Sequence, residues 1–126
     1  MKRIWLGIGA LVVFFVLGLW CSHAMDKLHT SLAQKLEQAA EAALAGDLQT
    51  GVTLAQEAKN SWEAHWHQTA ALADHTPMDE IDSLFAQLES YAQAGQISEF
   101  AAHCSRLSTL VAATAEAHAL SWWNLL

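Results

Sequence analysis

The residues best suited to chemistry lie close together in one short stretch of the chain. Carboxylates beside a histidine are suited to acid–base catalysis, or to holding a cation through oxygen ligands. The same residue types also end one helix and begin the next, because acids stabilise the first turn of a helix and histidine stabilises the last. We interpret the stretch as local structure first and as a ligand-binding site second. The candidate ligand residues are Asp74, His75, Asp79, Glu80 and Asp82.

Seven histidines raise the question of a metal site, and their spacing argues against one. His65 and His67 stand two residues apart, so on a helix their side chains point about 200° apart and cannot share one ion. The sequence contains neither a His-Glu-x-x-His motif nor the Glu-x-x-His pair of di-iron bundles. We therefore expect no metal ligands and no cofactor.

Nucleophilic catalysis has no support in the sequence either. There is no Gly-rich phosphate loop and no Gly-x-Ser-x-Gly motif. Cys104 lies on an apolar helical face, where a thiol usually belongs to the core, and Cys21 lies far from it in the chain. We expect both cysteines to be unpaired and the protein not to be an enzyme.

Composition limits the partners. The chain has 126 residues with a net charge of −7, 53% hydrophobic residues and 15% charged residues. It is too apolar to be disordered, and too acidic to bind nucleic acid through its phosphates. The charge is unevenly distributed. From residue 23 onward, 13 acids face four basic residues, a net charge of −9.

The N-terminal segment has the composition of a membrane anchor. Residues 4–20 carry no charge, and extending the run to Ser22 gives a helix of about 28 Å, near the ~30 Å hydrocarbon core of a bilayer. Trp5 and Trp20 bracket the run, as interfacial tryptophans do. We expect residues 4–22 to contact membrane lipid.

The basic pair Lys2 and Arg3 predicts the orientation, because basic flanks stay in the cytoplasm. The predicted division is a single-pass anchor at 1–22 in the cytoplasmic membrane, with its N-terminus inside, and an extracytoplasmic domain at 23–126. A cleaved signal peptide is the alternative, since Ser22-His23-Ala24 offers small residues to a peptidase. The length of the apolar run and the bulky Trp20 favour the uncleaved anchor, and Trp20 also argues against lipidation of Cys21.

The remaining residues have helical periodicity throughout. Apolar side chains recur at intervals of three and four in four segments, with Leu44, Val52 and Ile97 among the predicted core positions. Gly46 and Gly95 are predicted to end the first and third segments. The predicted fold is all-α, an N-terminal transmembrane helix followed by an antiparallel four-helix bundle of two αα-hairpins.

Three smaller features refine this prediction. The two halves repeat weakly at an offset of 49 residues, which aligns Gly46 with Gly95 and Leu36 with Phe85. Gly51 is predicted to weaken its helix near the start. The fourth helix should return toward the membrane, so its terminal pair can dock on the bundle, lie at the membrane interface or bind a partner. That pair is Trp122 and Trp123.

Several of these residues together are similar to a bacterial family catalogued as a domain of unknown function and found mainly in Firmicutes. The resemblance rests on Asp74-His75 followed by Glu80-Ile81-Asp82, on Trp62 and Trp66, and on the Asn124-Leu125-Leu126 ending. It implies a small protein with one N-terminal span and an extracytoplasmic helical domain. It implies no activity, substrate or cofactor.

We expect an interaction or scaffold protein of the bacterial cell envelope. This expectation rests on the anchor, on the Ala-rich helices and on the lack of a catalytic set of residues. Its expected partner is a protein that the sequence does not identify. The alternative is an extracytoplasmic sensor or a ligand- or cation-binding domain that uses the turn from Asp74 to Asp82.

Overall fold

The protein is all-α, as predicted. The computed structural model describes residues 1–69 and 76–124, apart from the side chains at 25, 66–69, 76–77 and 117–124. Within this part of the chain there are four helices and no strand. They are α1 (Lys2–Leu44), α2 (Leu48–Thr69), α3 (Thr76–Gln93) and α4 (Ile97–Asn124).

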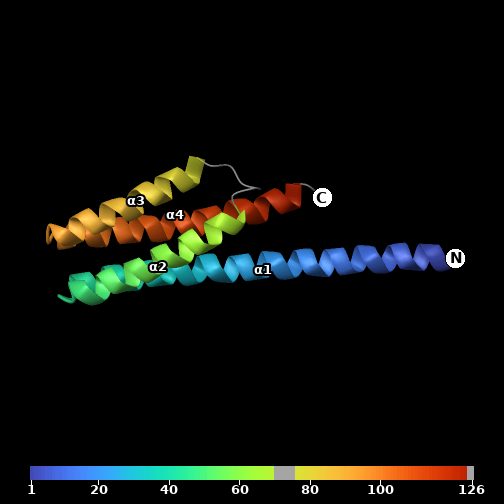
Figure 1. Cartoon of the computed structure of the whole chain (residues 1–126), viewed down its shortest axis with the longest axis horizontal. Coiled ribbons are helices and arrows are strands. Elements are labelled where there is room, and N and C mark those ends of the chain that lie inside the picture. The colour runs from blue at the N-terminus through green and yellow to red at the C-terminus, as the bar shows by residue number, and fades with distance from the viewer. Residues whose placement is uncertain (70–75, 125–126) are drawn as a thin grey trace.

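The apolar segment and the first helix of the domain form one uninterrupted helix (Figure 1). α1 is about 65 Å long, and the predicted boundary between residues 22 and 23 falls inside it without a break. Its first half is exposed over its whole circumference, with Trp5 at 73% and Trp20 at 72% exposure. Of the described helices, α1 is the one long and apolar enough to cross a membrane. Its second half supplies buried side chains to the core.

Glycine ends the first and third helices in the same way. Gly46 and Gly95 have φ values of 91° and 69°, in the left-handed region that favours glycine. The N–H of Gly46 bonds to Ala43 O, and the next N–H bonds back to Ala42 O. The bonds around Gly95 follow the same pattern, which is the Schellman motif. The 49-residue repeat is therefore present in the backbone of both turns.

Asp47 begins α2 as a side-chain cap, as the sequence predicts. Its carboxylate accepts hydrogen bonds from the backbone N–H of Thr50 at 3.1 Å and from the Thr50 hydroxyl at 2.6 Å. These bonds stabilise the charged form and lower the pKa of Asp47 below its ordinary value.

The helices form a bundle around one apolar core. α1 packs against α2 and α4, and α3 packs against α4, whereas α2 and α3 pack against each other only sparsely. α4 continues past the end of α2 and runs beside α1 toward the apolar segment (Figure 1). The largest fully buried side chains are Phe100, Leu36, Ile81, Leu107, Val111 and Cys104.

Three predicted core positions are wrong. Leu44 is 66% exposed because it faces away from the core in the last turn of α1, where its neighbour Ala43 is buried, and Ile97 is exposed as the first residue of α4. Val52 is partly exposed because the sparse contact between α2 and α3 leaves its face of α2 open. The core includes two polar residues instead, His29 and Ser108. The Ser108 hydroxyl donates to Ala33 O at 3.0 Å and so joins α4 to α1.

Gly51 has a different role from the one that the sequence suggests. A Cβ at this position would stand 2.9 Å from Ala39 O, 3.3 Å from the Phe100 ring and 3.4 Å from the Ala43 methyl. The missing side chain thus allows α2 to lie directly against α1, with the Phe100 ring over the contact. The cost in helix propensity is offset by packing.

Candidate functional sites

The predicted ligand residues do not converge on one site in the part of the chain that is described. Asp74 and His75 lie outside it, and Asp79 is exposed in the first turn of α3. Glu80 forms an ion pair with Arg106 of α4 at 2.9 Å, whereas Asp82 bonds to Trp62 of α2 at 3.0 Å. Two of the three described carboxylates therefore join α3 to different helices. Among the described residues, no three metal-binding side chains come together.

A cluster of polar and aromatic side chains joins α1, α2 and α3. We call it the His29 cluster, and it consists of His29, Trp62, His65 and Asp82. The His29 ring is buried and meets the Trp62 ring edge to face, with centroids 6.3 Å apart and an interplanar angle of 81°. The Trp62 indole N–H donates to Asp82 Oδ1. The cluster thus ties α1, α2 and α3 together.

The His29 cluster disfavours protonation of His65. Burial lowers the pKa of His65 first, and the nearby charge of a protonated His29 lowers it further. The sequence did not predict His29 as a core residue, because core positions were predicted from stripes of apolar side chains and histidine is polar. The signal was present, since His29 precedes Leu32 by three residues and Leu36 by seven.

This pKa shift predicts how folding stability depends on pH. The unfolded chain protonates His65 near pH 6.5, and the folded chain does so at lower pH. The contribution of neutral His65 to folding stability is therefore fully present above this pH range, and it is lost as the pH decreases through the range. Urea unfolding at pH 7.5 and 5.5 should show a smaller loss in His65→Gln than in the parent protein. His23→Gln, at an exposed site on α1, is the control and should leave the loss unchanged.

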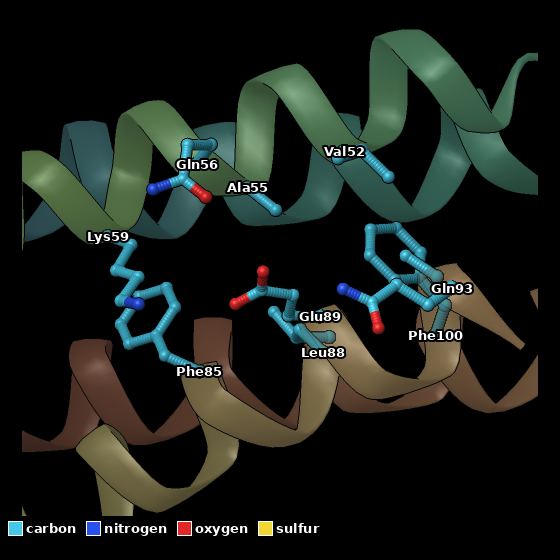
Figure 2. A pocket seen from close by; sticks show the side chains of 10 residues that line it. Val52, Ala55, Gln56, Lys59, Phe85, Leu88, Glu89, Gln93 and Phe100 are labelled. Atoms are coloured by element: carbon cyan, nitrogen blue, oxygen red, sulfur yellow. The ribbon is translucent and has the colours of Figure 1, made fainter.

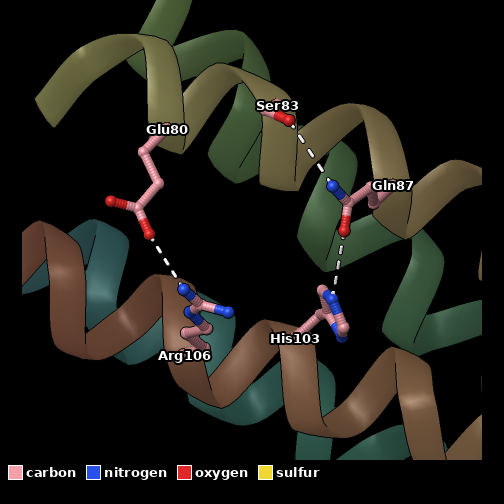
Figure 3. A network of polar contacts seen from close by, with 5 residues as sticks. All are labelled: Glu80, Ser83, Gln87, His103 and Arg106. Atoms are coloured by element: carbon pink, nitrogen blue, oxygen red, sulfur yellow. Dashed lines mark hydrogen bonds and ion pairs between the residues drawn. The ribbon is translucent and has the colours of Figure 1, made fainter. Parts of the chain in front are cut away.

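A row of polar contacts lies between α3 and α4 (Figure 3). Besides the Glu80–Arg106 pair, the His103 ring bonds through Nδ1 to Glu99 O at 3.0 Å and through Nε2 to Gln87 Oε1 at 3.2 Å. Gln87 also donates to the Ser83 hydroxyl at 3.4 Å. These side chains are largely exposed and satisfy one another, so their role is to hold two helices in register.

A groove opens where α2 and α3 diverge. It has a volume of about 310 Å³ and lies between residues 52–59 of α2 and 85–93 of α3, with Phe100 of α4 in its wall. We call it the α2/α3 groove. Figure 2 shows the side chains that line it, with the Glu89 carboxylate pointing into the gap and Lys59 extending toward Phe85. The groove is lined mainly by apolar surface.

A domain of unknown function, DUF4363, matches residues 19–125. The chain belongs to this family. The DUF4363 match begins within the last turn of the apolar segment and includes the bundle, both glycine turns, the His29 cluster and the α2/α3 groove. No curated protein and no solved structure matches the chain.

The remaining predicted residues fall into two groups within this DUF4363 chain. Trp5 and Trp20 are exposed at the two ends of the apolar segment, where an interface would place them. Trp122 and Trp123 lie on α4, and their side chains are outside the described set. Cys21 is exposed and Cys104 is buried, and the two are unpaired as predicted. Burial raises the pKa of Cys104 to about 12, so its thiol is unreactive at neutral pH.

Proposed function

We propose that this chain is a membrane-anchored interaction protein of the bacterial cell envelope. In this proposal residues 4–22 cross the cytoplasmic membrane with the N-terminus inside, and residues 23–126 form an antiparallel four-helix bundle of two αα-hairpins outside. The long apolar half of α1 supports the anchor, and the continuity of α1 supports a bundle held rigidly at the membrane. The acidic balance of the domain argues against nucleic acid as a partner.

The observation that carries the interaction role is the α2/α3 groove. The sparse packing of α2 on α3 leaves Val52 partly exposed at this groove, above the buried side chains of Phe85, Leu88 and Phe100. Apolar grooves between helices are common binding surfaces for partner helices.

Purification tests this role. The full chain, isolated from membranes in a mild detergent, should bring down the same protein partner in repeated preparations. A chain carrying Val52→Trp, which places a bulky ring in the groove, should lose that partner. Glu41→Trp, on an exposed face of α1, is the matched control. A strictly monomeric protein without a reproducible partner would contradict the proposal.

The proposed orientation predicts labelling from outside the cell. A cysteine placed at Gln34, an exposed position on α1, should react with a membrane-impermeant maleimide on intact cells in a Cys21→Ala background. Cys104 should stay silent, because a thiol with a pKa of about 12 is buried and almost fully protonated. Labelling that requires permeabilised cells would contradict the proposal, because it would place Gln34 and the helical domain on the cytoplasmic side.

A sensor of pH or of a ligand is the second candidate, and the His29 cluster favours it. The cluster places His65, whose pKa is lowered by burial and by the nearby His29, on a helix that also forms the bundle core, so protonation of His65 is coupled to packing. Melting curves of the parent protein and His29→Gln between pH 5 and 7, with and without a divalent cation, test this role. Superimposable curves for the two proteins would eliminate it.

A further inference from the structure

The last turns of α4 reach the level of the apolar segment of α1. α4 runs antiparallel to α1 (Figure 1), and the Ser108 hydroxyl donates to Ala33 O at 3.0 Å, so these two residues stand at nearly the same level. Because both helices rise about 1.5 Å per residue, each residue after Ser108 is level with the residue equally far before Ala33. Asn124, the last residue of α4, is 16 residues past Ser108 and is therefore level with Leu17, inside the apolar segment.

This register brings three tryptophans from distant parts of the sequence to one level. Trp122 and Trp123 are level with residues 19 and 18 of α1, next to Trp20. Trp20 is 72% exposed near the end of the apolar segment, where a bilayer interface is expected. Tryptophan is enriched at such interfaces because its ring is apolar and its N–H is polar. The backbone of α4 thus carries two further tryptophans to the depth of Trp20.

The acidic residues of both helices stop at one level as well. Asp26 is the first acid of α1, and Glu116 is the last acid of α4. Glu116 is eight residues past Ser108, so it is level with the residue that precedes Asp26. From this level toward the apolar segment, neither helix carries an acid, and α4 carries no lysine or arginine. Such a boundary, shared by two helices, is expected where both pass from water into a membrane interface.

The bundle core does not extend to this level along α1. The first buried residue that is described on α1 is His29. Residues 19–24, which are level with the last turns of α4, are all exposed. Docking on the bundle, one of the three roles predicted for Trp122 and Trp123, would therefore need a surface that α1 does not provide.

A cation stands just outside the shared boundary. Lys27 is exposed on α1, and no ion pair joins it to another residue in the part of the chain that is described. In the proposed orientation it lies about 7.5 Å beyond Ser22. That is close to the height of the lipid phosphates, since headgroups add about 5–7 Å to each side of the hydrocarbon core. Its charge is therefore complementary to the membrane surface at this height.

We propose that the last two turns of α4, residues 117–124, lie in the outer interface of the phospholipid bilayer beside α1, with Trp122 and Trp123 as the interfacial residues. This inference rests on the proposed anchor and its orientation, and it adds a second contact between the bundle and lipid. Two contacts fix the height and the tilt of the bundle above the membrane, which a single helix does not.

Spin labels on the full chain in phosphatidylcholine nanodiscs test the inference. One nitroxide is attached at a time, either at Cys21 or, in a Cys21→Ala background, at a cysteine in position 119, 120, 121 or 122. These four positions cover one full turn of α4 and are level with Cys21. Gln34→Cys, exposed on α1 above the membrane, is the control. Cys104 stays unlabelled because its thiol is buried and protonated.

The readout is the ratio of label accessibility to oxygen, which collects in lipid, to accessibility to a polar nickel chelate, which stays in water. We expect the highest ratio among the four positions to lie within about twofold of the ratio at Cys21, and at least about fivefold above that at Gln34.

A charged variant tests the part played by the tryptophans. Trp122→Glu with Trp123→Glu should lower the ratio at position 121 about fivefold, because carboxylates are costly at this depth, and should leave the ratio at Cys21 unchanged. Ser105→Glu with Thr109→Glu adds the same charge at exposed positions of α4 on the water side and should change neither ratio. An unchanged ratio in the tryptophan variant would overturn the role of the pair.

Two further results would overturn the inference. A ratio at all four positions as low as that at Gln34 would place the end of α4 in water, and low accessibility to both reagents would place it against protein. In either case a lipid-like ratio at Cys21 would leave the proposed anchor intact. A ratio at Cys21 as low as that at Gln34 would refute the anchor itself.

Discussion

Replacing Trp62 by alanine should lower the free energy of unfolding by about 3–5 kcal/mol, the usual range for a buried aromatic side chain. Trp62 is 4% exposed and lies where α1, α2 and α3 meet. Its ring packs against His29, and its N–H holds Asp82 of α3. The many alanines of α1 and α2 offer no side chain that can fill the space. Urea unfolding followed by circular dichroism of the full chain in detergent measures the loss.

Trp62→Phe separates packing from hydrogen bonding. It keeps most of the ring volume but removes the donor to Asp82, so the expected loss is about 1–2 kcal/mol. Asp82→Asn keeps an acceptor oxygen and should have a smaller effect than Trp62→Phe. A Trp62→Ala protein as stable as the parent would mean that the His29 cluster does not join the three helices.

Gly51→Ala should destabilise the protein, although alanine is the better helix former. Propensity alone predicts a gain of up to about 1 kcal/mol. The added Cβ, however, would stand 2.9 Å from Ala39 O, a backbone atom that moves only with α1. Overpacking of this kind typically costs about 1–3 kcal/mol, so the net change should be a loss. The same unfolding experiment gives the sign.

Gly18→Ala is the control for this substitution. It is also a helical glycine, but its added Cβ meets no atom within 4 Å, so packing does not oppose the change. We expect no loss of stability in Gly18→Ala. A gain in Gly51→Ala would show that α1 and α2 do not approach as closely as described, and would restore the interpretation based on helix propensity.

Local features of the fold were predictable from the sequence, because local residues determine them. Gly46 and Gly95 end their helices through their own backbone freedom, and the cap at Asp47 involves Thr50 three residues away. The apolar stripe of α3 was complete, since Met78, Ile81, Leu84, Phe85 and Leu88 are all buried. Each of these depends on spacing within one helix or one turn.

The sites depend instead on how distant helices face one another, and sequence reasoning did not find them. Trp62 and Asp82 are 20 residues apart, and their bond follows from the meeting of α2 and α3. Val52 fitted an apolar stripe, yet its helix face is left open because α3 packs mainly on α4. In the sequence, Gly51 looks like any glycine that weakens a helix. Its packing role depends on the close approach of α1, which the local sequence does not show.

Photocrosslinking in living cells tests the central claim most directly. Benzoylphenylalanine at position 93 on the groove rim is compared with the same residue at position 41, exposed on α1. The account predicts that position 93 alone forms an adduct with another envelope protein, identified by mass spectrometry. No adduct, or the same adducts from both positions, would contradict the claim that this anchored bundle binds a partner through the α2/α3 groove.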